Sequence, residues 1–399
     1  MSRVVVHYQD LKVGELAVAR GGIFFEYATE FIASGHELSP FYLPLGPGVK
    51  ARDTSAPTMR LPGLFEDSLP DHWGRRVMMA WFRKNGTPEH AATPLMMLAY
   101  VGRRAMGALD YTPELDVTVP DEVALPDLYA AAAEAERSGE IDLDVLAQVG
   151  SSAGGARPKA LLNLPDSGRG AAQAGSVAAA GYSSWIVKFD TSRDGTTGPL
   201  EEAYARMARA AGVDFPETRL LETKHADGVR RHFAVKRFDR DGSERLHHHT
   251  LGGLLHAGGG DLDYQTLLRA TRRLTKDERE VWRAYRRAVF NVLAGNRDDH
   301  AKNHGFIYRN RTWTLGPAYD LTFTSAQQMH ERGMAVCGER RAAGVEHLKK
   351  LATTEALDAK QAVGIIENVR AALAKWRTFA NEAGVPALVA AETEAAWRM

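Results

Sequence analysis

The sequence has almost no cysteine, the residue that forms disulfide bonds and most structural zinc sites. Cys337 is the single cysteine among 399 residues. One cysteine cannot close an internal disulfide and cannot make a cysteine-rich zinc module. A chain of this kind suits a reducing compartment, so we expect a cytoplasmic protein.

Long apolar runs and an excess of one charge are also missing. The opening stretch Met1–Leu16 lacks the apolar core of a signal peptide, and no later stretch has the roughly 18 uncharged apolar residues of a membrane-spanning helix. Lys and Arg together number 50, as do Asp and Glu. Without a net field to attract nucleic acid or anionic lipid, we expect a soluble protein that makes no membrane contact and is not exported.

The composition is that of a folded chain with a large core, because 44% of residues are hydrophobic and 25% are charged. The length suggests two or three domains. Short β-like runs open the chain, helix-like spacing follows from Leu69 to Met106, and Pro113–Pro126 has the composition of a connection between lobes. The second half is mostly helical, with amphipathic helices expected over Thr353–Trp376 and Val385–Trp397. This outline predicts an α+β, two-lobed kinase-like fold.

The chemistry is concentrated in the stretch Gly295–Leu321. Asp298 precedes Asn303 by five residues, and Asp320 follows seventeen residues later. Phosphoryl transfer needs one carboxylate to orient the attacking hydroxyl and oxygen ligands to hold Mg²⁺. A β-hairpin over residues 305–315 would return the chain so that Asp320 lies beside Asn303 and shares a metal with it. The alternative is that Asp298 and Asp299 only cap a helix end.

Two upstream segments fit the same chemistry. Small residues lead into a strand at 150–162, where backbone N–H groups could approach phosphate oxygens; the candidates are Ser151, Ser152, Ala153, Gly154 and Gly155. Lys188 lies in an apolar strand, where it either faces an anion or reaches the solvent. Its acidic partner is expected on the next helix, at Glu201 or Glu202. The alternatives are a plain tight turn and a lysine on an exposed edge strand.

A third segment, the strand His232–Asp239, runs into a polar break. In a two-lobed kinase such a strand leads to the hinge that lines the adenine pocket. Backbone groups near Lys236, Arg237 and Phe238 would then be available to the base. Phe238 could equally be a core residue.

These ordered segments, together with FYLPLGPG and GLFEDSLPDHWGRR near the N-terminus, resemble the HipA family of serine/threonine-protein kinase toxins. The resemblance covers nearly the whole chain and implies a fold similar to that of phosphatidylinositol and protein kinases. It implies a HipA N-terminal subdomain over 1–112, a kinase N-lobe over 113–238 and an all-helical C-lobe over 239–399.

The resemblance also implies roles for individual residues, with ATP and Mg²⁺ as cofactors. Asp298 matches the catalytic base, Asn303 and Asp320 the Mg²⁺ ligands, and Lys188 the ATP-phosphate lysine with Glu201 as its partner. Ser152, or its neighbour Ser151, matches a serine whose autophosphorylation ejects the loop and switches the enzyme off. The residues expected to contact the nucleotide are the loop 151–155, Lys188, Lys236, Phe238, His300 and Lys302.

The chain departs from the family pattern at two places. Arg157-Pro158 precedes the loop lysine Lys159 where relatives often carry Gln-Glu or Gln-Pro, and Lys236 stands where a hinge glutamate is expected. The adenine contacts are therefore less well defined than the metal site. The implied partners are a helix-turn-helix antitoxin, through which DNA is bound indirectly, and a protein substrate such as an aminoacyl-tRNA synthetase.

Three alternatives stay open at this point. A metal hydrolase could use the histidines at 247, 248, 249, 256, 300 and 304, although Asp299-His300 reverses the usual His-Asp order and no H-E-x-x-H motif occurs. His300 would otherwise brace the loop. A pseudokinase would bind nucleotide and act through its partner. A small-molecule or lipid kinase shares the Asp-x₄-Asn and Asp pattern.

Overall fold

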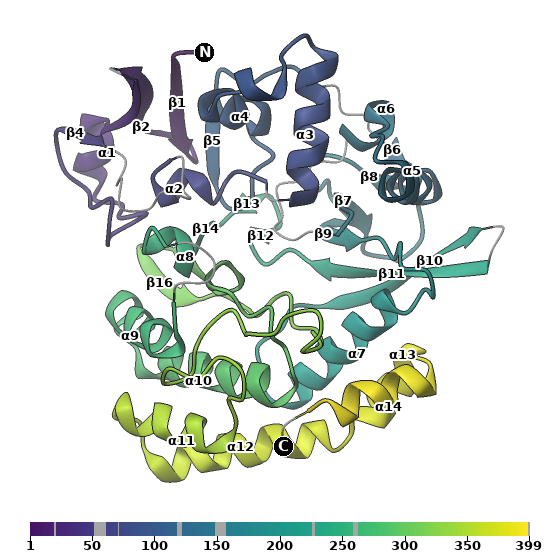
Figure 1. Ribbon diagram of the computed structural model, residues 1–399. Helices are drawn as coiled ribbons and strands as arrows, with labels where there is room; N and C mark the ends of the chain where they lie inside the picture. The colour runs from purple at the N-terminus through teal and green to yellow at the C-terminus, as the bar shows by residue number, and fades with distance from the viewer. Residues whose placement is uncertain are drawn as a thin grey trace. The chain divides into compact units, whose positions relative to one another are not determined.

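The protein is described here by a computed structural model, which covers residues 1–19, 21–51, 61–70, 72–117, 122–147, 157–225, 228–257 and 262–397. These residues form two compact units whose boundaries interleave along the chain (Figure 1). Unit 1 comprises Met1–Arg193, Leu221–His249 and Gly253–His256, and unit 2 comprises Asp194–Leu220, Thr250–Gly252 and Ala257–Met399. The three-domain division expected from the sequence stays a prediction.

Unit 1 begins with a five-stranded antiparallel sheet in the order β4-β3-β2-β1-β5. Its strands are β1 (Arg3–Tyr8), β2 (Leu11–Ala19), β3 (Gly22–Tyr27), β4 (Val49–Ala51) and β5 (Leu109–Thr112). Alternate side chains of β1, at Val4, Val6 and Tyr8, are buried, as expected for a strand with one face on the core. The helices of this part are α1 (Thr29–Ser34), α2 (Gly63–Glu66), α3 (His72–Lys84) and α4 (Pro94–Val101).

The second sheet has the order β10-β11-β9-β7-β8-β6. Its strands are β6 (Glu122–Val123), β7 (Lys159–Pro165), β8 (Ala172–Gln173), β9 (Tyr182–Lys188), β10 (Thr218–His225) and β11 (Gly228–Lys236), and the helices α5 (Leu125–Ser138) and α6 (Leu143–Leu146) follow β6. Trp185 and Val187 of β9 pack into an apolar cluster with Leu128 of α5 and Trp73 of α3. Because side chains alternate along a strand, the lysines at the ends of β7 and β9 belong to the opposite face.

Unit 2 is mainly helical. Its helices are α7 (Thr197–Ala210), α9 (Tyr264–Thr275), α10 (Glu278–Leu293), α11 (Val345–Thr354), α12 (Ala359–Leu373), α13 (Trp376–Ala383) and α14 (Ala387–Ala395), while α8 (Leu251–Leu254) spans the boundary between the units. Asp263 and Asp277 accept N-cap hydrogen bonds that start α9 and α10. The apolar stripe of α10 is fully buried, so α10 is a core element of this unit. Among the described residues, none of the helices is long and apolar enough to cross a membrane.

The expected hairpin is confirmed as β15 (Gly305–Arg309) and β16 (Thr312–Leu315), which pair antiparallel. Asn310 and Arg311 both adopt positive φ, as a two-residue hairpin turn requires. The C-terminal part is therefore not all-helical. It also contains the short strands β12 (Arg240–Asp241), β13 (Glu244–Arg245) and β14 (His247–Thr250), because the polar break after β11 forms a small hairpin of its own.

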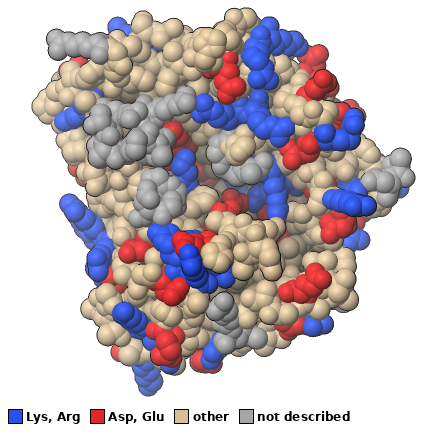
Figure 2. Space-filling view, viewed as in Figure 1, with Lys and Arg blue, Asp and Glu red and all other residues tan. Residues whose placement is uncertain are grey.

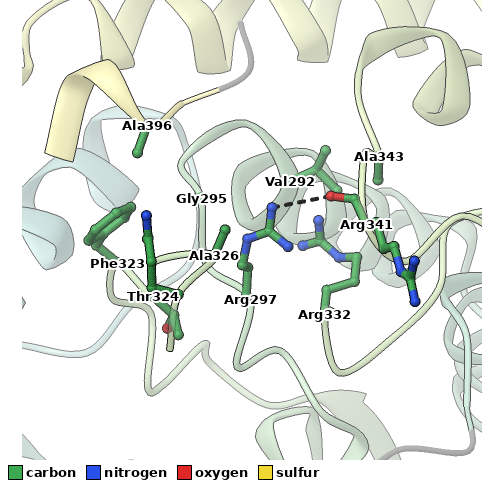
Figure 3. Close-up of a pocket in the computed structure, with 11 residues that line it drawn as sticks. Val292, Gly295, Arg297, Phe323, Thr324, Ala326, Arg332, Arg341, Ala343 and Ala396 are labelled. Carbon is green, nitrogen blue, oxygen red and sulfur yellow. Dashed lines mark hydrogen bonds between the residues drawn. The ribbon is translucent and has the colours of Figure 1, made fainter. Parts of the chain in front are cut away.

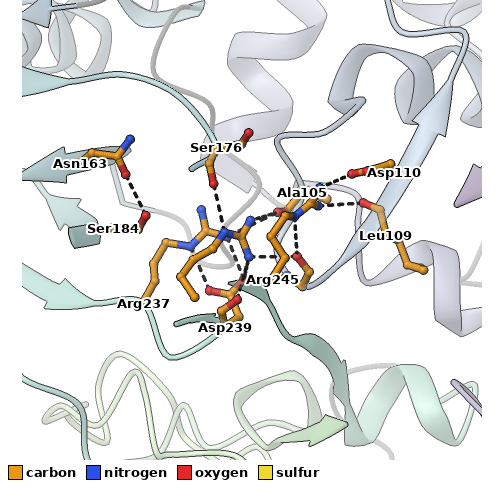
Figure 4. A network of polar contacts seen from close by, with 11 residues as sticks. Ala105, Leu109, Asp110, Asn163, Ser176, Ser184, Arg237, Asp239 and Arg245 are labelled. Atoms are coloured by element: carbon orange, nitrogen blue, oxygen red, sulfur yellow. Dashed lines mark hydrogen bonds and ion pairs between the residues drawn. The ribbon is translucent and has the colours of Figure 1, made fainter. Parts of the chain in front are cut away.

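A buried ionic network holds the end of β11 against the loop before β5, within unit 1 (Figure 4). Asp239 is fully buried and accepts hydrogen bonds from Arg237 at 2.8 Å, Arg240 at 2.8 Å and the Gly107 backbone N–H at 2.7 Å. Arg240 also donates to the carbonyl of Ala105. Burial by itself would raise the pKa of Asp239, but the two guanidinium groups lower it far below its usual value. The carboxylate therefore stays charged.

Two histidines on β14, His247 and His249, are also involved in the packing of unit 1. His249 bonds to Asp67 at 2.6 Å and to the Ser39 hydroxyl at 3.0 Å, and His247 lies 2.9 Å from the Leu38 carbonyl. Burial lowers the pKa of His247 to about 3. The neutral ring then donates to the carbonyl, so this part of the core is built around an uncharged imidazole.

The Arg237–Asp239–Arg240 network predicts a large effect of one substitution. Asp239→Asn leaves two buried guanidinium groups without their carboxylate, so we expect the free energy of unfolding to fall by about 3–5 kcal/mol. Circular dichroism recorded during urea unfolding measures this free energy in wild type and variant. Glu134→Gln is the control, because the Glu134–Arg137 pair is exposed and its loss should leave the urea midpoint unchanged. Equal midpoints for both variants would contradict this role of Asp239.

His247 predicts how stability depends on pH. Its pKa is lower in the folded state than in the unfolded chain, so only the unfolded state takes up a proton as the pH falls below about 6.5. Stability is therefore retained above that pH and lost toward acid, by roughly 2 kcal/mol at about pH 5 from this residue alone. Urea midpoints measured from pH 8 to pH 5 should show this loss, with a shallower slope in His247→Gln. An unchanged slope in that variant would refute the assignment.

Candidate active site

The loop after α10 places its two neighbouring aspartates in opposite environments, within unit 2. Asp299 is fully buried, whereas the side chain of Asp298 is 52% exposed. Asp299 accepts hydrogen bonds from the Tyr264 hydroxyl at 2.6 Å and from Arg332 at 2.7 Å, and its second oxygen lies 3.4 Å from the Met334 backbone N–H. Asp299 is thus a structural anchor, while Asp298 is presented to solvent.

Asn296 connects this loop to the segment that carries Asp320. Its side-chain oxygen accepts the backbone N–H of Asp298 at 3.1 Å, and its side-chain nitrogen donates to the backbone carbonyl of Asp320 at 3.4 Å. The Tyr319 hydroxyl donates to the Lys302 carbonyl at 2.6 Å, which is a second link between the same two segments. The structure therefore brings Asp298 and Asp320 to one Asn side chain, although 22 positions separate them in the sequence.

The hairpin and a buried arginine produce this return of the chain. Phe306 lies opposite Leu315 in the β15–β16 register, and the Gly316 backbone N–H donates to the Gly305 carbonyl at 2.9 Å. Arg287 of α10 donates to the Gly316 carbonyl at 2.6 Å from a fully buried position, where burial lowers its pKa to about 10. Arg287 thereby fixes the end of the strand that leads to Asp320, and no sequence motif marks it for this role.

The side-chain oxygens of Asn303 and Asp320 suit a hard cation. Asn303 lies at the end of a short 3₁₀ turn, and its amide nitrogen donates to the Asp298 carbonyl at 2.7 Å. That bond commits the nitrogen, so the amide oxygen is the atom available to a ligand. Asp320 has a φ of 51°, a strained conformation for a non-glycine residue that is often found at functional positions. Carboxylate and amide oxygens are the atoms that Mg²⁺ prefers, with phosphates and waters completing its shell.

The histidines of this region do not form a metal cluster. Within the described ranges, no group of three or more His, Cys, Asp or Glu could hold an ion. His300 lies 3.8 Å from Asp298, and Lys302 is half-buried beside it in the loop. Burial lowers the pKa of His304 well below its usual value, so His304 is a neutral core residue.

Lys188 lies in unit 1, in a row of side chains across the second sheet. Lys159 of β7 and Phe233 of β11 are its direct cross-strand neighbours. Directly opposed residues share a face, so the Lys159 and Lys188 side chains lie on the same face of the sheet, and the Lys188 ammonium is 5.7 Å from the Phe233 ring centre. This doubly positive row suits phosphate oxygens. The sequence alone gave no reason to pair Lys159 with Lys188.

The acidic candidates for Lys188 lie on α7, in unit 2. Arg206 binds the Glu202 carboxylate at 2.7 Å. Glu201 is also buried. A Lys188–Glu201 pair stays a prediction.

The remaining predicted nucleotide contacts have different outcomes. Ser151, Ser152, Ala153, Gly154 and Gly155 lie outside the described residues. Lys236 is half-buried at the end of β11 and Phe238 packs edge-on against His248 at 5.4 Å, which is compatible with either role considered for Phe238. Arg237 belongs to the buried network around Asp239, so its side chain is structural.

Comparison with known proteins gives two family matches. The HipA N-terminal domain model matches residues 4–112, and the HipA-like C-terminal domain model matches residues 151–376. Y4dM of Sinorhizobium fredii, named as a candidate kinase, is 28% identical over 280 residues, which is 67% of this chain and 63% of Y4dM. A Haemophilus influenzae protein named in the same way is 29% identical over 145 residues, 31% of this chain and 40% of that protein. The chain thus spans less than two thirds of these relatives.

A solved structure shares the fold. HipA of Shewanella oneidensis MR-1, determined with HipB and its operator DNA, aligns with a TM-score of 0.70 and 17% identity, covering 98% of this chain and 95% of that one. The C-terminal family model alone matches more than half of the 399 residues. This chain therefore belongs to the HipA family and has its α+β, kinase-like fold.

Proposed function

We propose that this protein is an ATP- and Mg²⁺-dependent kinase that phosphorylates serine or threonine in a protein substrate. The observation that carries the proposal is the Asn296 bridge, which holds the exposed Asp298 and the strained Asp320 within one loop assembly. A general base must be reachable by the substrate hydroxyl whose proton it accepts, and metal ligands must be held in a fixed position. Asp298 meets the first requirement, and Asn303 and Asp320 meet the second.

The roles follow from the chemistry of each group. Asp298 would accept the proton of the attacking hydroxyl. Asn303 and Asp320 would hold Mg²⁺, which when bound with ATP supplies positive charge to the phosphates. In unit 1 the Lys159–Lys188 row would bind phosphate oxygens, with Glu201 orienting Lys188 and the 151–155 loop covering the nucleotide. Lys236, Phe238, His300 and Lys302 are proposed as further contacts to the nucleotide.

Regulation and partners are proposed by family analogy. Ser152 is the proposed autophosphorylation site, and charge added there would eject the loop from bound phosphate. The related Shewanella structure holds HipA with HipB and operator DNA, so a HipB-like antitoxin is the proposed partner and DNA contact would be indirect. Figure 2 shows basic and acidic side chains interspersed over one face of the molecule. An aminoacyl-tRNA synthetase is the proposed class of substrate.

Adjacent aspartates offer a matched test of this function. Asp298→Asn should lose phosphoryl transfer by a factor of at least ~10² while retaining wild-type stability, because Asp298 is exposed and acts on the proton. Asp299→Asn should instead be destabilised by about 3–5 kcal/mol, because Arg332 then stays buried without its carboxylate. The assay uses labelled ATP with Mg²⁺, followed by mass spectrometry of residues 148–156 and by urea unfolding.

The outcomes separate the alternatives. Label on Ser152 or Ser151 in the wild type and none in Asp298→Asn supports the proposed kinase. ATP binding without label transfer to any protein or small molecule would favour a pseudokinase. Wild-type activity in a folded Asp298→Asn protein would exclude Asp298 as the base and refute the assignment.

A further inference from the structure

We propose that a groove on unit 2, formed where α12 packs against α7 and α10, binds an acidic side chain of a partner polypeptide (Figure 1). The groove has a volume of about 400 Å³ and opens to solvent. Its apolar lining consists of alanines from the end of α7 and from α12. Its polar lining is Arg286 of α10, Asn368 of α12 and Lys375, which follows α12. No acidic residue is among the described residues that line it.

The positive charge of the groove is not balanced by this chain. Neither Arg286 nor Lys375 forms an ion pair with another residue of the described ranges. Arg286 is half-buried, and burial lowers its pKa without any acidic group that acts in the opposite direction. The nearby carboxylate of Glu367 on α12 pairs with Arg370 at 3.2 Å. The groove therefore favours a negatively charged group from another molecule.

Arg286 is already oriented for such a group. Its Nη1 donates to the Ala211 carbonyl at 2.9 Å, and a Cβ on Gly212 would be 3.2 Å from the same atom, so the guanidinium lies against the backbone there. Within the described part of the chain, its Nε and Nη2 have no acceptor. Two parallel N–H donors on one edge of a guanidinium match both oxygens of a carboxylate. A donor that is ordered before the ligand arrives loses little conformational entropy on binding.

Arginines also line the cavity beside the loop after α10 (Figure 3). There, however, Arg332 pairs with Asp299 at 2.7 Å and Arg341 pairs with Glu331 at 2.9 Å. These guanidinium groups are engaged by carboxylates of the chain itself. The groove beside α12 differs because its cationic groups have no such partner among the described residues.

The helix ends at the groove favour a carboxylate over a phosphate. Helix α7 ends at Ala210 and α12 ends at Leu373, and both ends lie at the groove. The carbonyl end of a helix carries a partial negative charge, which opposes a dianion more strongly than a monoanion. The alanine methyl groups offer an apolar surface to the short aliphatic stem of an aspartate or glutamate. The chemistry of the groove therefore fits an acidic side chain.

The open shape favours a polypeptide over a small metabolite. Sites for small molecules usually bury most of the ligand, whereas Asn368, Ala371 and Lys375 are exposed along the groove. An occupant would place one acidic group in the groove and leave the rest of itself outside. The Asn368 amide has both a donor and an acceptor to offer to the backbone of a segment that lies along α12.

Fluorescence anisotropy tests the groove with a short labelled peptide of alternating glutamate and alanine, at low ionic strength. The matched ligand has glutamine in place of each glutamate. Arg286→Gln should weaken binding of the glutamate peptide at least ~10-fold, because a charge-assisted contact is lost. Ala371→Glu should do the same, because it places a carboxylate of this chain in the groove. Arg279→Gln, an exposed arginine of α10 paired with Asp277, should stay within ~2-fold of wild type.

A second variant and a cross-link locate the contact. Lys375 is exposed, so Lys375→Gln leaves the core intact and should also weaken binding of the glutamate peptide. Circular dichroism confirms that each variant is folded. A carbodiimide joins carboxylates to adjacent amines, and mass spectrometry should then find the peptide on Lys375 in preference to Lys360, an exposed lysine at the other end of α12.

Several outcomes would overturn the proposal. One is equal affinity of the glutamate peptide for wild type, Arg286→Gln and Lys375→Gln, and another is equal affinity of wild type for the two peptides. Undetectable binding of the glutamate peptide to folded wild type has the same consequence. Duplex DNA binding or dimer formation that depends on Arg286, in place of peptide binding, would assign the groove to another occupant. None of these measurements uses kinase activity, so the groove and the proposed function are tested independently.

Discussion

One buried carboxylate organises the candidate active site. Asp299 has no contact with solvent, and a charge in that position needs several hydrogen bonds to be stable. It obtains them from Tyr264 on α9, from Arg332 and from the Met334 backbone, which belong to elements far apart in the sequence. The loop is fixed as a result, and the preceding side chain, Asp298, is exposed to solvent.

The same logic recurs at the end of β11. Asp239 is locked between Arg237 and Arg240, and the flanking Lys236 and Phe238 stay at partly exposed positions. In both places a buried ion pair sets the backbone, and its neighbours carry the proposed chemistry. The arrangement explains why charged residues come in adjacent groups in this sequence. Within each group, burial separates the structural member from the residues proposed to act on the nucleotide or the substrate.

The sequence predicted the hairpin, whose geometry is local. The hairpin between Asn303 and Asp320 follows from two β-rich runs around Asn310, and both ends are close because the strands pair. Tyr264, Asn296 and Arg332 were missed because their roles come from contacts between distant segments, and neither composition nor spacing encodes them. Likewise, the Lys159–Lys188 pairing depends on the register between β7 and β9. That register cannot be predicted from the sequence, because the Gly- and Ala-rich segment 166–181 separates the two strands. One helix was expected over 353–376, but Thr353 and Thr354 end α11, and α12 begins only at Ala359, after Ala356 with a positive φ and the Asp358 N-cap.

The central claim is that Asn303 and Asp320 hold a divalent cation for a bound nucleotide. Calorimetric titration with a non-hydrolysable ATP analogue, with and without Mg²⁺, tests it most directly in wild type and Asp320→Asn. We predict that Mg²⁺ raises the nucleotide affinity of the wild type and that Asp320→Asn loses this increase while keeping its metal-free affinity. An equal Mg²⁺ dependence in both proteins would contradict the account.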